Sequence, residues 1–332
     1  MKKILLIMPN FFEYPENIIS ELRNMNYDVD FYDDRPSTNS FVKALVRINP
    51  DVIRTYIRNY LFKIIKETKC KQYDILFLIS GQSLSFDGDM MKEFKKTQPN
   101  AMFVLYQWDS LKNFKRVTSI YEYFDKKYSF DRYDCLLNDE LIFLPLFYSP
   151  KYKEIGDKNI KMYKYDLCFV GTAHPKKYKL ISRMATQLKE KFPNQFIYFF
   201  LPSPIVYLYR KVMNIEFRNS KYYEFNYKSM KEEILENLFC DSYCILDSPQ
   251  DGQIGLTMRV FEMLGAKKKL ITTNEDVINY DFYKKENIYI YSGEIDFNDI
   301  FFKTDYVEIE KKVYYKYSLN SWLKEILSEV GK

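Results

Sequence analysis

The chain alternates short, uninterrupted apolar runs with longer stretches of helical periodicity, and it does so twice. In chain order, the predicted strands are KKILLIM, YDVDFYD, YDILFLIS and AMFVLYQ, and later YDLCFVG, FIYFFLP, YCILD, KKLITTN and NIYIYS, and most of them are continuous apolar runs. Continuous apolar runs are typical of parallel sheets, whose strands are covered on both faces. Because the runs alternate with helical stretches, the sequence predicts an α/β protein with two doubly wound parallel sheets.

A chain of 332 residues is too long for one ordinary core, so two domains are expected. The alternating pattern breaks up over residues 128–150, and the polar stretch KYKEIGDKNIKMYK follows. We interpret that stretch as a linker. The predicted organisation is an N-terminal domain at 1–150, a C-terminal domain at 151–317 and a terminal amphipathic helix at 318–332.

Composition narrows the class of protein. Apolar residues make up 47% of the chain and charged residues 29%, which is the profile of a soluble globular protein. The apolar run after MKK is too short for a signal peptide, and no run is long enough to span a membrane. We therefore expect a cytoplasmic protein. Its five cysteines are scattered and His174 is its single histidine, so neither a metal site nor a cofactor is expected.

The charge is unevenly distributed along the chain. Residues 151–231 hold 17 Lys and Arg against 6 Asp and Glu, a net of +11, whereas residues 232–332 hold 12 against 19, a net of −7. A concentrated positive field suits phosphate groups, anionic lipid or nucleic acid. No helix-turn-helix, RRM or zinc pattern accompanies it, and the adjoining acidic segment offsets it, so no nucleic-acid partner is expected.

Common nucleotide signatures are missing from the sequence. The turn after the first apolar run, PNFFEYPEN, has no glycine, although a dinucleotide-binding turn requires several, and no GxxxxGK[ST] motif occurs. Asp87 and Asp89 form a carboxylate pair that could hold a divalent cation. They directly precede a helical stretch, where acids favour the positive end of the helix dipole, so we interpret them as a helix start.

The stretch FVGTAHPKK is the first candidate binding element. A strand is predicted to end at Val170, a tight turn to carry Gly171 and Thr172, and Pro175 to begin a helix. The free N–H groups of a helix start form an anion site. The side chains that add positive or hydrogen-bonding groups beside it are His174, Lys176, Lys177 and Arg183. The alternative is an ordinary strand-to-helix turn with solvated lysines.

The second candidate element is QDGQIGLTMRVFEMLG, which holds three of the nine glycines. It follows the strand YCILD, and in open α/β sheets ligands bind beyond the carboxyl ends of the strands. We expect Thr257 to be the N-cap and Gly265 the C-terminal cap of a helix. Gly252 and Gly255 would let the backbone approach a ligand closely.

Arg259 and Glu262 stand three residues apart in that helix. A cation in the first helical turn opposes the dipole, so Arg259 is better explained by a bound anion such as a diphosphate. Glu262 shares its face and could accept two hydroxyl hydrogen bonds, as from a ribose. The alternative is a surface ion pair, which would contribute only about 0.2–0.5 kcal/mol.

These pieces resemble a known family. The pattern QxGLTxRxxE followed by KKLITTN is similar to the donor half of GT-B glycosyltransferases, and more narrowly to CgeB-like or capsular and lipopolysaccharide biosynthesis glycosyltransferases of bacteria. The stretches YDDRP, LYQWDS, YSFDRYD, FVGTAH and YDFY add to the resemblance. One departure is Lys177, where the family pattern leads us to expect an arginine. Lysine keeps the charge but not a bidentate phosphate clamp.

The resemblance implies two Rossmann-like domains facing across a cleft and transfer of a sugar from a nucleotide-sugar to a surface glycan. It implies no catalytic metal, because helix N-termini and basic side chains stabilise the leaving diphosphate. It places the donor in the C-terminal domain. The residues expected to hold it are Gly171, Thr172, His174, Lys177, Gln253, Gly255, Leu256, Thr257, Arg259 and Glu262.

An inverting enzyme would need a base from the N-terminal domain to take the proton of the acceptor hydroxyl. Asp109 is the leading candidate because Trp108-Asp109-Ser110 follows the run AMFVLYQ directly. Glu13 and Asp34 occupy similar strand-end positions, and Asp131 is a weaker option. Each could instead cap a helix, and in a retaining enzyme these residues would orient the acceptor.

Two rival functions and one partner stay open at this point. A polyol-phosphate transferase would want a catalytic histidine pair, and a GT-B relic without turnover could serve as an assembly or coat protein. A lipid-linked glycan acceptor would bring the protein to the cytoplasmic face of the inner membrane as a peripheral protein. The stretch SPIVYLYRKVMNIEFRNSKYY mixes aromatic and basic residues as membrane-surface segments do, but it could equally be a core-facing helix.

Overall fold

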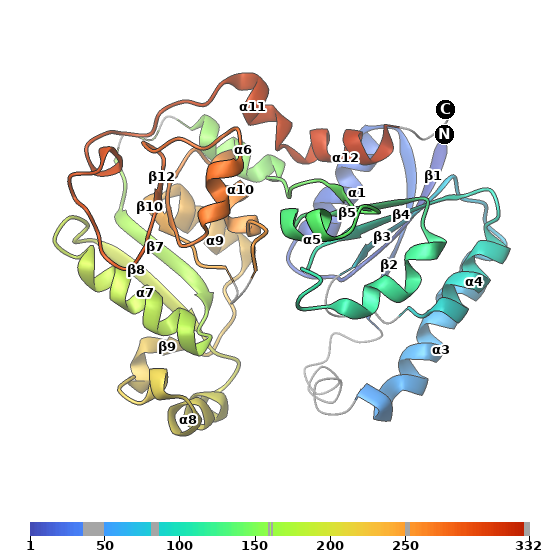
Figure 1. The fold of residues 1–332 in the computed structure, drawn as a ribbon, viewed down its shortest axis with the longest axis horizontal. Helices are drawn as coiled ribbons and strands as arrows, with labels where there is room; N and C mark the ends of the chain where they lie inside the picture. Colours follow the sequence, from blue (N-terminus) through green and yellow to red (C-terminus); the bar gives the residue numbers. More distant parts are fainter. Residues whose placement is uncertain (36–49, 81–85, 159, 161, 250–252, 329–332) are drawn as a thin grey trace. The chain divides into compact units, whose positions relative to one another are not determined.

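The computed structural model describes residues 1–35, 50–80, 86–158, 160, 162–249 and 253–328 (Figure 1). The chain divides into two compact units. The N-terminal unit comprises Met1–Pro145, Gln253–Gly255 and Leu319–Lys332, and the C-terminal unit comprises Leu146–Gly252 and Leu256–Ser318. The N-terminal unit therefore takes in both a short piece of the loop around residue 254 and the end of the chain.

The N-terminal unit is built on a six-stranded sheet in the order β2-β1-β3-β4-β5-β6, and every pairing in it is parallel. Its strands are Lys2–Met8 (β1), Tyr27–Asp33 (β2), Ile75–Ser80 (β3), Met102–Gln107 (β4), Lys126–Ser129 (β5) and Ile142–Phe143 (β6). All six residues of β3 are buried. The expectation from the apolar runs is thus confirmed, because a strand covered on both faces cannot alternate apolar and polar residues.

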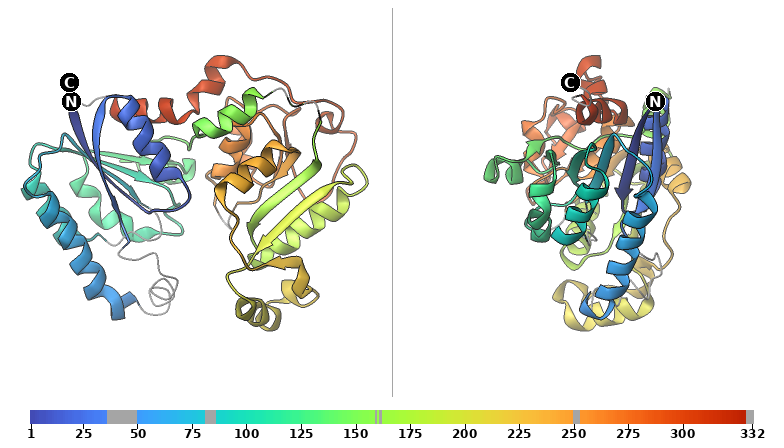
Figure 2. Two further views of the ribbon diagram at one scale, coloured as in Figure 1. Left: turned by 180° about the vertical axis from the view of Figure 1, so that it is seen from behind. Right: turned by 90° about the vertical axis from the view of Figure 1, so that its right-hand side faces the viewer.

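Helices cover both faces of this sheet (Figure 2). One face packs on α3, α4 and the 3-10 helix η1, through a core that includes Leu5, Leu76, Phe94 and Ile120. The other face carries the C-terminal helix α12, whose Trp322 ring lies 4.7 Å from that of Tyr106. The helices of this unit are Tyr14–Asn24 (α1), Pro50–Thr68 (α3), Gly88–Thr97 (α4), Lys115–Tyr123 (η1), Arg132–Leu137 (α5) and Leu319–Leu327 (α12).

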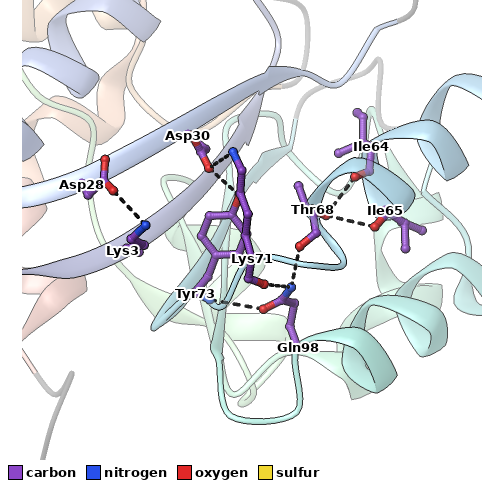
Figure 3. Close-up of polar contacts among 9 residues, drawn as sticks. All are labelled: Lys3, Asp28, Asp30, Ile64, Ile65, Thr68, Lys71, Tyr73 and Gln98. Atoms are coloured by element: carbon purple, nitrogen blue, oxygen red, sulfur yellow. Dashed lines mark hydrogen bonds and ion pairs between the residues drawn. The ribbon is translucent and has the colours of Figure 1, made fainter.

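A buried amide fixes the amino end of this sheet (Figure 3). The Gln98 side chain donates to the carbonyls of Thr68 (3.1 Å) and Lys71 (2.8 Å) and accepts the N–H of Tyr73 (3.2 Å). Lys71 in turn donates to Asp30 at 2.8 Å. These bonds join the end of α3 to the start of β3, which satisfies buried polar groups and leaves the opposite edge of the sheet for ligands.

The C-terminal unit repeats the architecture with the strand order β12-β11-β10-β7-β8-β9, again wholly parallel. Its strands are Tyr165–Thr172 (β7), Gln195–Phe200 (β8), Phe225–Asn226 (β9), Ser242–Leu246 (β10), Lys269–Thr272 (β11) and Ile288–Ile290 (β12). The strands β7 and β10 are neighbours although β8 and β9 come between them in the sequence. The winding direction therefore reverses between β7 and β10.

The helices of this unit are Pro150–Asp157 (α6), Pro175–Gln187 (α7), Pro204–Met213 (α8), Glu232–Cys240 (α9), Met258–Gly265 (α10) and Lys311–Lys316 (α11). Short 3-10 turns occupy Ile215–Phe217 (η2), Tyr222–Glu224 (η3), Glu275–Asn279 (η4) and Ile300–Phe302 (η5). None of the helices in the described ranges is both long enough and apolar enough to cross a membrane.

Two sequence-based expectations differ from the structure. The stretch interpreted as a polar linker begins with helix α6, which buries Tyr152 and Ile155 three residues apart. The terminal helix groups with the N-terminal unit from Leu319 onward.

Candidate functional site

The point where the winding of the C-terminal sheet reverses is the natural place for a ligand. Leu167 and Cys168 of β7 pair with Cys244 and Ile245 of β10, and the chain leaves these two strands toward different helices. Such a divergence opens a crevice beyond the carboxyl ends of the strands. The stretch after β7 is FVGTAHPKK and the stretch after β10 leads to α10, so the topology brings both predicted elements to this one edge.

Gly171 and Thr172 lie in β7 itself, paired with Phe199 and Phe200 of β8. The expectation of a turn at these two residues is therefore wrong, since the strand runs past Val170. A Cβ atom at Gly171 would lie 2.8 Å from the ring of Phe169, which explains the glycine by side-chain crowding.

The turn into α7 lies at Ala173 and His174. His174 is the exposed N-cap residue, its side chain makes no capping bond, and Pro175 opens the helix as expected. The Ala173 N–H donates to the Phe200 carbonyl at 2.9 Å. The side chain of Arg210, from α8, donates to the Ala173 carbonyl. Sequence reasoning missed Arg210 because nothing in the spacing of α8 connects it with this turn.

Thr257 is the N-cap residue of α10, as predicted, but its hydroxyl does not cap the helix. It donates to the Asp247 carboxylate at 3.0 Å, and Thr272 donates to the other oxygen of that carboxylate at 3.2 Å. Asp247 is 6% exposed. It therefore ties the ends of β10 and β11 to the start of α10.

Arg259 and Glu262 form an ion pair in which the glutamate is buried and the arginine is partly buried. The Arg259 Nε and a Glu262 carboxylate oxygen are 3.6 Å apart, and their side chains are 19% and 5% exposed. The guanidinium also lies over the Phe239 ring, 4.1 Å from its centroid. The ion pair is therefore present, as the structural alternative supposed, but it is less exposed to solvent than a surface pair and couples more strongly.

Lys177, at the start of α7, interacts electrostatically with Asp247 and with Arg259 of the second element. Burial lowers the pKa of its ammonium, the Asp247 carboxylate acts in the opposite direction, and the Arg259 guanidinium lowers the pKa further. Two cations from α7 and α10 therefore lie close enough to repel one another, with Asp247 as the neighbouring anion. A bound diphosphate would relieve that repulsion.

Tyr152 of α6 lies beside the ion pair. Burial raises the pKa of its phenol, the Glu262 carboxylate raises it further, and Arg259 opposes both effects. The Tyr152 side chain is 1% exposed. Sequence reasoning assigned this residue to the linker and therefore missed it.

The glycine-rich loop has a structural explanation at two of its positions. A Cβ atom at Gly255 would lie 2.5 Å from the Phe130 ring, and Gln253 donates to the Gly255 carbonyl at 2.8 Å. Both residues group with the N-terminal unit, whereas the fully buried Leu256 belongs to the C-terminal unit. Gly252 lies outside the described residues.

Gly265 is the last residue of α10 and not its C-terminal cap. The cap is Ala266, and the left-handed residue that follows is Lys267, with a φ of 52°. A Cβ atom at Gly265 would lie 2.6 Å from the Tyr148 ring, and its carbonyl accepts the Tyr314 hydroxyl at 2.7 Å. Close packing therefore selects glycine at this position.

In the N-terminal unit, the candidate bases lie where the sequence placed them, after β1, β2 and β4. Asp109 and Glu13 are partly exposed, and Glu13 is the N-cap residue of α1. Asp34 is fully buried, with its carboxylate 3.7 Å from the Arg35 guanidinium. A base must reach an acceptor, so the geometry favours Asp109 and Glu13 over Asp34.

The carboxyl edge of this sheet is lined by aromatic rings. Trp108 lies 5.7 Å from Phe11 and 5.4 Å from Tyr14, measured between ring centroids. Phe12 beside them has a positive φ of 50° and is exposed. Asp109 follows Trp108 directly and so stands at the border of this aromatic cluster.

Two other acids that the sequence singled out in this unit, Asp131 and Asp87, have structural roles. Asp131 is buried and its carboxylate accepts the Tyr133 N–H at the start of α5 (3.0 Å). Asp87 is the N-cap of α4 and accepts the Met90 N–H at 3.0 Å, which confirms the helix-start interpretation. In the described ranges, no three His, Cys, Asp or Glu side chains are grouped as metal ligands would be.

Comparison with known proteins supports the fold. No protein-family model matches the sequence, and no curated protein matches it. Three solved structures are similar over 99% of this chain and 99% of their own. They are a glycosyltransferase from Rickettsia africae (15% identity, TM-score 0.56), Anabaena HepE with UDP and glucose (9%, 0.58) and the catalytic domain of Arabidopsis thaliana starch synthase IV with ADP and acarbose (10%, 0.57). The chain therefore has the two-domain α/β fold of GT-B glycosyltransferases, as predicted.

Proposed function

We propose that this protein is a glycosyltransferase that moves a sugar from a nucleotide-sugar donor to a glycan acceptor. One observation carries the proposal. Lys177 in the first turn of α7 and Arg259 in the first turn of α10 follow the neighbouring strands β7 and β10, at the edge where an open α/β sheet binds its ligand. Two neighbouring cations at such an edge suit a ligand with a diphosphate.

The similar structures support the same ligand class. HepE was solved with UDP and glucose, and starch synthase IV with ADP and acarbose. For this chain we infer a donor bound by the C-terminal unit and an acceptor belonging to a surface polysaccharide such as capsule or lipopolysaccharide. The inference about the acceptor rests on the sequence patterns QxGLTxRxxE and FVGTAH. We place the reaction on the cytoplasmic side of the inner membrane.

The residues of the site divide the chemistry between them. The N–H groups at the start of α7, together with Lys177 and Arg259, stabilise the leaving diphosphate, and this electrostatic stabilisation needs no metal. Glu262 accepts the ribose hydroxyls, and Arg259 holds its carboxylate in place. In an inverting reaction, Asp109 takes the proton of the acceptor hydroxyl, and Glu13 is the alternative base.

Calorimetric titration tests the donor site. The purified protein is titrated with UDP, GDP, dTDP, CDP and CMP without added metal, and we expect micromolar binding of one of them. Lys177→Ala and Glu262→Ala should each lose that binding. The matched controls Lys179→Ala and Glu233→Ala change exposed residues of α7 and α9 and should keep it.

Each failure has its own meaning. If no nucleotide binds, the chain is better explained as a non-catalytic assembly or coat protein with a GT-B fold. Binding of CDP or CMP without glycosyl transfer would favour a polyol-phosphate transferase. If binding requires a divalent cation, the metal-independent mechanism is wrong while the glycosyltransferase proposal survives.

A further inference from the structure

Helix α8 turns its apolar side toward solvent. Ile205, Leu208, Tyr209, Val212 and Met213 recur at the spacing of one helix face, and each is between 60% and 76% exposed. Of the ten residues of α8, only Tyr207 is buried. The sequence left open whether this stretch faces the core or a membrane surface, and a core-facing helix is now excluded.

The polar residues of α8 point into the unit. Arg210 donates to the Ala173 carbonyl, and Lys211 donates to the Ser220 carbonyl at 2.8 Å and to the Tyr207 hydroxyl at 3.0 Å. A surface helix of a globular protein normally has the opposite arrangement, with apolar residues inward and cations outward. Internal hydrogen bonds therefore fix the helix in an orientation that exposes its apolar side.

The chain after α8 extends this surface. Ile215 is 69% exposed and Tyr223 is 75% exposed. Together with the five exposed residues of α8, these two side chains form what we call the α8 face. Scattered apolar residues are normal on protein surfaces, but these seven, together with the exposed Tyr222, lie in one segment of 19 residues, 205–223, and indicate a binding surface.

Basic residues border the α8 face. The exposed cations of the following segment are Arg218, Lys221, Lys228 and Lys231. Over residues 204–231 the chain holds six Lys and Arg against two Glu. Helix α8 lies at the end of the C-terminal unit next to β9, the edge strand of the sheet (Figure 1). The apolar face and its cations are therefore presented at an edge of the unit.

We propose that the α8 face docks on an anionic membrane surface. Helices that lie in the membrane interface combine an apolar face with tyrosines and flanking cations, and both occur here. A second copy of the chain fits less well, because a two-fold contact would bring the cations of both copies together. This surface goes beyond the proposed function, and its test does not depend on catalysis.

Vesicle flotation tests the proposal. The full chain is mixed with vesicles of phosphatidylcholine alone or of equal parts phosphatidylcholine and phosphatidylglycerol. We expect it to float with the anionic vesicles and to be released by salt. The double variant Leu208→Ser, Val212→Ser should bind at least about tenfold more weakly, because it removes two side chains that would be buried in the interface.

A matched variant controls for general loss of apolar surface. Leu136→Ser, Leu137→Ser changes two side chains of the N-terminal unit that are 73% and 68% exposed, and it should float like the unaltered protein. Equal loss in both double variants, or no flotation of the unaltered protein, would overturn the proposal. Nucleotide binding by each variant, measured in the same preparations, shows that the site of the C-terminal unit is intact.

The charged border has its own test. Arg218→Gln, Lys221→Gln should lower binding to anionic vesicles and leave flotation with phosphatidylcholine vesicles as it is for the unaltered protein. Light scattering of the free protein should give the mass of one chain. If the protein is instead a dimer that Leu208→Ser, Val212→Ser converts to a monomer, and no vesicle binds, then the α8 face is a self-association surface and the membrane proposal is wrong.

Discussion

The two sheets share one architecture, but the residues that follow their strands differ in kind. Beyond the N-terminal sheet lie the rings of Phe11, Tyr14 and Trp108, with the acid Asp109 at their border. Beyond the C-terminal sheet lie the cations Lys177 and Arg259. The sheets supply the same rigid edge, and the loops give it an aromatic, acidic character in one unit and a basic one in the other.

This contrast suits the two edges to different substrates. A basic edge suits the anionic part of a substrate, and an acid beside aromatic rings suits a neutral hydroxyl compound whose proton must be removed. In the proposed reaction the first is the donor nucleotide and the second is the acceptor. Substitutions at the two edges should therefore change different kinetic parameters.

The largest effect is expected at the N-terminal edge. Asp109→Asn removes the proton acceptor and keeps the shape of the side chain, so kcat should fall by about 10²–10⁴. Nucleotide affinity, measured by calorimetry, should stay the same. The control Asp139→Asn changes an exposed acid of the same unit and should leave kcat unchanged. A normal kcat in Asp109→Asn would transfer the role to Glu13 or favour a retaining reaction.

The next effect concerns stability and depends on the end of the chain. Trp322→Ala removes the ring that packs on Phe77 and Tyr106, and the free energy of unfolding of the N-terminal unit should fall by about 3–5 kcal/mol. Urea unfolding followed by circular dichroism measures it. Lys324→Ala on the exposed side of α12 should change stability by less than about 0.5 kcal/mol. Equal stability of the two variants would contradict the assignment of α12 to the core.

A smaller effect is expected at the basic edge. Arg259→Gln removes a cation that would contact the diphosphate, so nucleotide affinity should fall by about 1.5–3 kcal/mol while kcat at saturating donor changes less. Arg259→Lys keeps the charge but loses the planar fork and should be intermediate. Calorimetry and steady-state kinetics separate the two parameters. A fall in kcat without a change in nucleotide affinity would contradict the assignment of nucleotide binding to the C-terminal edge and of proton removal to the N-terminal edge.

The smallest effect is a pH dependence from a buried lysine of the C-terminal unit. Lys268 is 4% exposed, and burial lowers its pKa from 10.5 to about 8. Between these two pH values the unfolded chain binds the proton and the folded chain does not, so the contribution of Lys268 to stability rises with pH by up to about 1.4 kcal/mol per unit. Below about pH 8 that contribution is absent.

The variant Lys268→Met isolates this contribution. Urea unfolding between about pH 8 and pH 10 should show a rise for the unaltered protein that is missing from the variant. Lys303→Met changes an exposed lysine of the same unit and should keep the rise. Parallel curves for all three proteins would show that Lys268 is charged in the folded state.

The strands and the start of α10 were predictable because their signals are local. Continuous apolar runs mark buried parallel strands, and Thr257 at the N-cap and Asp87 before α4 follow from helix-start chemistry. The reversal between β7 and β10 then follows from the order of the strands. The sequence thus placed the candidate edge without any knowledge of side-chain contacts.

The missed features depend on contacts between residues distant in sequence. The sequence of helix α6 is mostly polar. Tyr152 is buried by contacts with Phe239 and Glu262, which are distant in sequence and come beside it only in the folded protein. Arg210 reaches Ala173 from another helix, and Gly265 is selected by the Tyr148 ring. No local propensity reports such packing, because propensity describes one segment at a time.

Because α12 belongs to the N-terminal unit, the sequence of the C-terminal unit is inserted within the sequence of the N-terminal unit. Both its first residue, Leu146, and its last, Ser318, are flanked by chain that belongs to the other unit. A fragment that stops near residue 150 would lack α12 and leave Phe77 and Tyr106 without the Trp322 ring that packs on them. Exchange of the C-terminal unit between related chains, by recombination or by design, therefore needs two crossovers, one on either side of the inserted unit.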